Sequence, residues 1–158
     1  MHTGPVEIVA EMDAGCEPAE LFSWVGDLSR YPQWLEIVTR AEPSAGGTTE
    51  DGTAPAWAVD LRGRIGPLAR SKRLRMVRTV HDAPRSVRFE RQELDGRSHS
   101  PWTLEADVTG DGSRSHLTMR LRYGGGLFGP VLERVLRDEI ERSRPRLAAL
   151  AEAGAAQT

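Results

Sequence analysis

The sequence predicts an α+β fold in which an antiparallel sheet packs against a long C-terminal helix. Apolar and polar residues alternate in a series of short segments between Val6 and Tyr123, as in half-buried strands. Glycine, proline and Asp-Gly turns separate these segments, so consecutive strands run antiparallel. After residue 126 the apolar spacing changes from two to about 3.6, which indicates an amphipathic helix.

Length and composition predict one domain over residues 1–158, with an ordered core at about 6–151 and frayed termini. A chain of this size buries roughly two-thirds of its unfolded surface without needing disulfides. Charged residues make up 28% and hydrophobic residues 39%, which is typical of globular proteins. The net charge of −2 lacks the basic excess of a nucleic-acid binder, so we expect no nucleic-acid partner.

The first elements are expected to be a strand at residues 6–12 and a helix opened by Pro18. Proline suits the first helical turn because its missing N–H would have no partner there. Ser29 is an acceptable N-cap for a second short helix over residues 30–36.

A short strand is expected at residues 37–43, and the glycine-rich stretch 45–53 is interpreted as a loop or hairpin tip. Further turns are predicted at Gly66-Pro67, at 82–84, at Asp95-Gly96 and at 110–112. The strands between them are expected at 57–62, 72–80, 87–90, 102–108 and 117–123.

The C-terminal helix is expected to begin near Leu127, after the glycines at 124–126, and to run for roughly 24 residues. Val131 and Val135 belong to its apolar stripe, and charged residues occupy most of the other face. Pro145 predicts a bend, or a division of the helix near Glu141.

These residues resemble the START-like superfamily, the polyketide cyclase/dehydrase and lipid transport group, over about residues 6–150. Four features carry the resemblance. Strand 6–10 is followed by a helix, and residues 27–34 contain an Asp, a Tyr-Pro pair and a Trp. Residues 87–90 lead through Asp95-Gly96 to Trp102, and the glycines at 124–126 precede the C-terminal helix. It implies a helix-grip fold, with a seven-stranded curved sheet around the last helix and a cavity for a lipid, sterol, quinone or polyketide. Some members cyclise or dehydrate polyketides, but the family offers no universal catalytic signature.

Strand alternation and the resemblance together give a candidate ligand-binding set. Its members point toward the predicted helix, lie on that helix, or lie in the segment that the resemblance places at the cavity mouth. The apolar and aromatic candidates are Tyr31, Trp34, Trp57, Val59, Met76, Phe89, Trp102, Met119, Val131 and Val135. Each could equally be an ordinary core residue.

Arg78 and Arg91 share the inward parity of their strands and complete the candidate set. A buried guanidinium needs a carboxylate partner or a wet cavity, and Glu93 has the parity to pair with Arg91. Either arginine could bind a carboxylate, phenolate or carbonyl of a ligand. Alternatively the strands end there and both side chains reach solvent.

No metal site or cofactor is expected. His2, His81, His99 and His116 have no metal-ligand spacing, and Cys16 is the one cysteine. No nucleophile, base and orienting group are placed together by the sequence, and His99 is the one plausible acid or base among the histidines.

The segment 62–78 carries seven basic residues and no acidic one. Such a hairpin could contact anionic membrane headgroups or an acidic protein, or it could be a solvated edge whose charges discourage aggregation.

Three functions remain open. The leading one is a carrier or chaperone for a small hydrophobic ligand. The second is a polyketide cyclase or dehydratase in which Arg78 or Arg91 stabilises an enolate and His99, Glu93 or Tyr123 moves protons. The third is a membrane-peripheral or protein-interaction module using the basic hairpin. A single thiol and the absence of a signal-peptide pattern favour the cytoplasm. Ligand identity and oligomeric state are not predicted.

Overall fold

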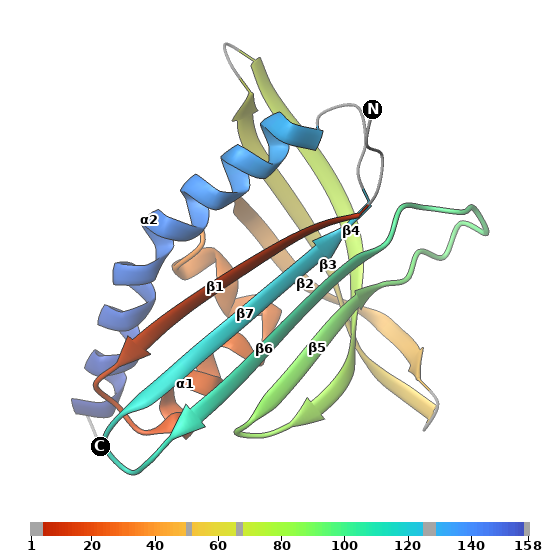
Figure 1. Ribbon diagram of the computed structural model, residues 1–158. Coiled ribbons are helices and arrows are strands. Elements are labelled where there is room, and N and C mark those ends of the chain that lie inside the picture. Colours follow the sequence, from red (N-terminus) through yellow and green to blue (C-terminus); the bar gives the residue numbers. More distant parts are fainter. Residues whose placement is uncertain (1–4, 50–51, 66–67, 125–128, 157–158) are drawn as a thin grey trace.

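A computed structural model describes residues 5–49, 52–65, 68–124 and 129–156 (Figure 1). The elements follow in the predicted order of strand, two short helices, six strands and one long helix. They are β1 (Val6–Ala14), α1 (Pro18–Val25), η1 (Leu28–Gln33), β2 (Val38–Thr49), β3 (Gly52–Ile65), β4 (Leu68–Asp82), β5 (Ser86–Arg91), β6 (Trp102–Gly110), β7 (Ser115–Tyr123) and α2 (Gly129–Ala156).

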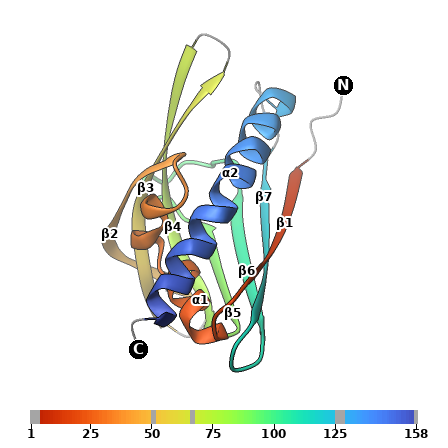
Figure 2. The same ribbon diagram turned by 90° about the vertical axis from the view of Figure 1, so that its left-hand side faces the viewer.

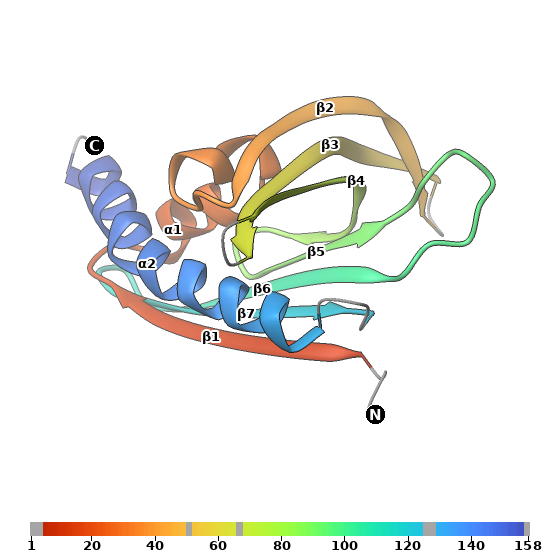
Figure 3. The ribbon, with the colours of Figure 1, turned by 90° about the horizontal axis from the view of Figure 1, so that it is seen from above.

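The seven strands form one antiparallel sheet in the order β1-β7-β6-β5-β4-β3-β2, which confirms the predicted fold class. The sheet is strongly curved, so that β2, β3 and β4 rise opposite β1, β7 and β6 (Figure 3). Helices α1, η1 and α2 all lie on the concave side, and α2 runs along it between the two limbs of the sheet (Figure 2). One buried apolar cluster joins the sheet to all three helices.

Polar contacts attach α2 to the edge strand β1 at two separate levels. The Gly15 N–H donates to the Glu152 carboxylate at 2.8 Å, close to the C-terminal end of β1. Near the other end of the strand, Arg137 donates to the Glu7 carbonyl at 3.5 Å. The helix is therefore fixed along the sheet edge, and the side chains between the two attachments form one wall of the site.

The second helix differs from the expectation of 30–36 capped by Ser29. It is a 3₁₀-helix over Leu28–Gln33, and the Asp27 carboxylate caps it by accepting from the Ser29 N–H at 2.9 Å. Pro32 explains the tighter turn, because its missing N–H cannot make the α-helical bond to the Leu28 carbonyl.

The stretch 45–53, interpreted as a loop, is largely strand, since β2 runs to Thr49 and β3 begins at Gly52. A register shift between Ser44 and Gly47 lets β2 fold closely over β4. A Cβ on Gly47 would lie 2.3 Å from Val77 Cγ2, so only glycine permits this approach. The buried Arg75 fixes the bend by donating to the carbonyls of Gly46 and Gln92, both at 3.0 Å.

Helix α2 is continuous across Pro145 and has 28 residues, as expected of one long helix, and the alternative of a division near Glu141 does not occur. It also extends beyond the expected limit of order at residue 151, because Ala151 is fully buried and its last turns pack on α1. The expected helix start at Leu127, the glycines at 125–126 and the turn at Gly66-Pro67 lie outside the described residues. No helix in the described ranges is both long and apolar enough to cross a membrane.

Candidate functional site

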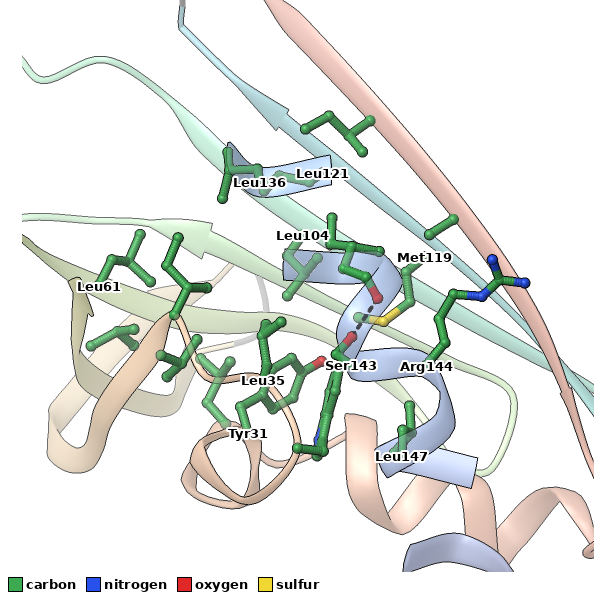
Figure 4. Close-up of a pocket in the computed structure, with 18 of the residues that line it drawn as sticks. Tyr31, Leu35, Leu61, Leu104, Met119, Leu121, Leu136, Ser143, Arg144 and Leu147 are labelled. Carbon is green, nitrogen blue, oxygen red and sulfur yellow. Dashed lines mark hydrogen bonds between the residues drawn. The ribbon is translucent and has the colours of Figure 1, made fainter. Parts of the chain in front are cut away.

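A cavity of about 120 Å³, measured as the space open to the centre of a water molecule, lies between the concave face of the sheet and α2 (Figure 4). Its wall is almost entirely apolar. The lining residues are Ile8, Ala10, Glu11, Met12, Leu28, Tyr31, Trp34, Leu35, Ile37, Val38, Val59, Leu61, Leu74, Met76, Trp102, Leu104, Leu117, Met119, Leu121, Leu136, Ile140, Ser143, Arg144 and Leu147.

Tyr31 and Trp34 lie in the cavity wall and are 1% and 3% exposed, so they do not form the rim of a mouth as expected. The Tyr31 hydroxyl donates to the Val25 carbonyl at 2.8 Å, and the Trp34 indole N–H donates to the Trp24 carbonyl at 3.2 Å. Burial raises the pKa of Tyr31 far above its usual range. The polar atoms of both rings are thus used to hold η1 against α1, and the rings present apolar surface.

Four strand residues of the candidate set also line the cavity. They are Val59, Met76, Trp102 and Met119. Strand alternation assigned these four residues to the concave face, since successive side chains of a strand point to opposite faces. The strand pairing agrees: Val59, for example, lies directly opposite Leu74, which also lines the cavity.

Phe89 and Trp57 lie behind the cavity wall. Phe89 is fully buried between the rings of Tyr31, at 6.2 Å, and Trp57, at 5.6 Å, with both pairs edge to face. The Trp57 indole N–H donates to the Ser29 hydroxyl at 2.9 Å. These two aromatic residues support η1 from below, which strand parity alone could not distinguish from lining the cavity.

Arg78 and Arg91 point to the concave side but are not among the lining residues. Arg78 donates to the Gly26 carbonyl at 2.9 Å, beneath the α1–η1 junction, and burial lowers its pKa. Arg91 pairs with Glu93 at 2.6 Å, the partner that parity predicted, and donates to the Ser100 carbonyl at 3.2 Å. Each guanidinium therefore has a protein acceptor.

Val131 and Val135 are also absent from the lining. Val131 is 47% exposed, and Val135 faces β3, where a Cβ on Gly63 would lie 3.4 Å from Val135 Cγ1. The apolar stripe of α2 is broad, and its phase places Leu136, Ile140 and Leu147 on the cavity instead.

An outer depression between β1 and α2 was not predicted. It is formed by Asp13, Glu141, Pro145 and Ala148, and Met12 and Arg144 line both this depression and the cavity. Arg144 bonds both oxygens of the Glu141 carboxylate, at 3.1 and 3.0 Å, and its guanidinium points away from the apolar wall (Figure 4). The signal was present in the sequence, because Arg144 lies four residues after Ile140 and three before Leu147, which places it beside the apolar stripe of the helix.

His116 joins two carboxylates, one of which, Asp13, lines this depression. Its Nδ1 lies 2.7 Å from Asp13 and its Nε2 lies 3.1 Å from Glu11. These hydrogen bonds raise the pKa of His116 above its usual value.

The raised pKa predicts a pH-dependent contribution to stability. It should be fully present below the ordinary histidine pKa and be lost as pH rises through the raised value. Because the group is half-exposed, we expect less than about 1 kcal/mol. Thermal unfolding of the wild type and of His116→Gln between pH 5 and pH 9 should converge at high pH; a constant difference would contradict the assignment.

The other candidates lie away from the cavity. His99 pairs with Asp95 at 2.8 Å on the exposed β5–β6 connection. Cys16 is buried 3.7 Å from the Ser115 hydroxyl, and burial raises the pKa of its thiol, so it is poorly reactive. No group of His, Cys, Asp and Glu in the described part of the chain could hold a metal ion.

The basic hairpin 62–78 divides its charges between both faces of the sheet. Arg73 is paired with Asp60 at 2.7 Å on the outer face, and Arg75 and Arg78 are bonded to backbone carbonyls. The hairpin therefore presents fewer free cations than its sequence suggests.

Comparison with known proteins agrees with this geometry. The family model described as "Polyketide cyclase / dehydrase and lipid transport" matches residues 5–152. No curated protein matches the sequence. A START superfamily protein from Mycobacterium smegmatis has a similar fold, with a TM-score of 0.68 at 15% identity, over 93% of this chain and 97% of that one.

Two aromatase/cyclase structures share the fold. Zhui from Streptomyces sp. R1128 has a TM-score of 0.69 at 10% identity, over 94% of each chain. The di-domain ARO/CYC StfQ of the steffimycin biosynthetic pathway has a TM-score of 0.62 at 14% identity, over 97% of this chain and 51% of that one. With the family model covering nearly the whole chain, the protein belongs to the polyketide cyclase/dehydrase and lipid transport family.

Proposed function

We propose that the protein binds a small hydrophobic ligand in the cavity between the sheet and α2, as a carrier or chaperone. The observation that carries the proposal is the composition of the wall. Of its described residues only Glu11 of β1 and Arg144 of α2 are ordinarily charged, and both lie on the side of the cavity where α2 meets β1. A concave, mostly apolar site with few polar groups is the usual form of a small-molecule pocket.

The size of the cavity favours a compact ligand. At about 120 Å³ the cavity is well above the roughly 10–15 Å³ that a single water occupies. Ring compounds and short acyl chains fit this space better than a full phospholipid or a sterol. The buried rings of Tyr31, Trp34 and Trp102 offer apolar surfaces suited to a flat ligand.

Organic extraction of the purified protein followed by mass spectrometry tests this function directly. We expect a retained hydrophobic molecule, and a rise in Tm with fatty acids, quinones or aromatic polyketides. A ligand present at 100 times its Kd stabilises by about 2.7 kcal/mol, or about 5–10 °C for a domain of this size. A protein that yields no molecule and shows no shift with any of these classes would refute the proposal.

A second function is polyketide cyclisation or dehydration, favoured by the family description and by the aromatase/cyclase structures with the same fold. Arg144 is the one cation among the described lining residues, but its guanidinium is paired with Glu141 and points away from the wall, so it would have to turn inward to stabilise a developing enolate. Conversion of a poly-β-ketone by the wild type but not by Arg144→Gln would support it. If the wild type leaves the substrate unchanged, the enzymatic function is excluded and the carrier function remains.

The cytoplasm remains the proposed location, supported by the single reduced thiol. Membrane-peripheral binding through hairpin 62–78 is the weakest alternative, because several of its arginines are already bonded within the protein. Binding to anionic vesicles that weakens as salt is added would support the membrane-peripheral function.

A further inference from the structure

Lys72 stands apart from every other basic residue of the chain. It is the single lysine among 21 lysines and arginines. Most of the described arginines bond a carboxylate or a carbonyl, whereas Lys72 makes no hydrogen bond or ion pair with any residue in the described ranges. Its ammonium group is thus available to a partner from outside the chain.

The register of β3 and β4 places Lys72 on the concave face. Lys72 lies directly opposite Leu61, which lines the cavity, and Leu74, two residues further along β4, lines it as well. Arg73, the next residue, points to the outer face and pairs with Asp60. Leu61 lies at the end of the cavity remote from Arg144 (Figure 4), so Lys72, which is exposed and does not itself line the cavity, stands beyond that end.

Arg91 supplies a second positive charge on the same face. Arg91 lies opposite Met76 of β4. On its other side β5 and β6 run antiparallel with Glu90 opposite Thr103, so the next residue, Arg91, lies beside Trp102. Met76 and Trp102 both line the cavity. Burial and the neighbouring Arg91 lower the pKa of Lys72, and Glu93 opposes them, which indicates that the three side chains share one region.

We propose that Lys72, supported by Arg91, binds the anionic head group of an amphipathic ligand whose apolar body fills the cavity. The class of ligand is a carboxylate on a ring system or a short acyl chain. This inference rests on the proposed ligand-binding function and adds the chemistry of one end of the ligand. Arg91 is already paired with Glu93, so the unpaired Lys72 supplies the charge that the head group would compensate.

Decanoate and 1-decanol are a matched pair of probes, since they share the chain and differ in the charge of the head group. Isothermal titration at pH 7 should show that the wild type binds decanoate at least about tenfold more tightly than 1-decanol. Lys72→Met should remove this preference, and Lys72→Arg should retain it. Arg73→Met is the matched control, because it removes the same charge from the adjacent residue on the other face.

Reductive methylation with ¹³C-formaldehyde gives a second readout, since Lys72 is the one side-chain amine of the chain. Its NMR signal should shift on addition of decanoate, and its pKa should rise because a nearby anion favours the charged amine. A small shift and an unchanged pKa would argue against contact.

The outcomes separate this inference from the proposed function. Equal binding of decanoate and 1-decanol by the wild type, or a preference that survives in Lys72→Met, overturns the role of Lys72 and leaves the cavity as a ligand site. Failure of both probes, together with the ligand classes tested above, overturns the proposed function and with it the role of Lys72.

Discussion

Replacing Ala10 by phenylalanine is expected to weaken binding of apolar ligands by about 100-fold, or about 2.8 kcal/mol. Ala10 points from β1 into the cavity, where its small side chain leaves room for the proposed ligand. A benzyl group at this position would fill much of the 120 Å³ available. Titration with decanoate, and loss of the molecule retained after purification, measure the effect.

Val9→Phe is the matched control for this substitution. Val9 precedes Ala10 on the same strand, but its side chain is 43% exposed on the outer face. We expect unchanged affinity in Val9→Phe and unchanged or higher Tm in Ala10→Phe, because the new ring enters existing space rather than a packed core. Full affinity in Ala10→Phe would show that the ligand binds elsewhere.

The two substitutions also test the alternation of apolar and polar residues that predicted the strands of the sheet. In β7, for example, Leu117, Met119 and Leu121 alternate with polar residues. Where local rules failed, a long-range contact was responsible. The strand character of 45–49 depends on Gly47 packing over Val77 and on Arg75 bonding the bend, neither of which local sequence shows.

The cavity was less predictable than the sheet, for a related reason. Parity tells which face a side chain occupies, but η1 covers part of that face and α2 another part. Phe89 therefore lies under Tyr31, whereas Met76, facing the same side, reaches the cavity. The depression at Arg144 depends on how α2 packs against β1, which the apolar pattern of a single helix does not specify.

Phe89→Ala is expected to destabilise the protein by about 3–5 kcal/mol, among the largest effects for a single residue. Phe89 is fully buried and contacts both Tyr31 and Trp57 edge to face. Its removal would leave a void beneath η1, which the hydrogen-bonded rings above cannot easily fill. Urea unfolding should show a lower midpoint with an unchanged slope.

Met119→Ala provides the comparison that distinguishes core from wall. Met119 is half-buried and already borders the cavity, so its truncation enlarges existing space and should cost less than Phe89→Ala. Ligand binding should respond in the opposite order: Met119→Ala should shift preference toward bulkier ligands, whereas folded Phe89→Ala should keep the wild-type preference. A small loss of stability in Phe89→Ala, accompanied by weaker binding, would instead mean that Phe89 contacts the ligand, as strand parity alone suggested.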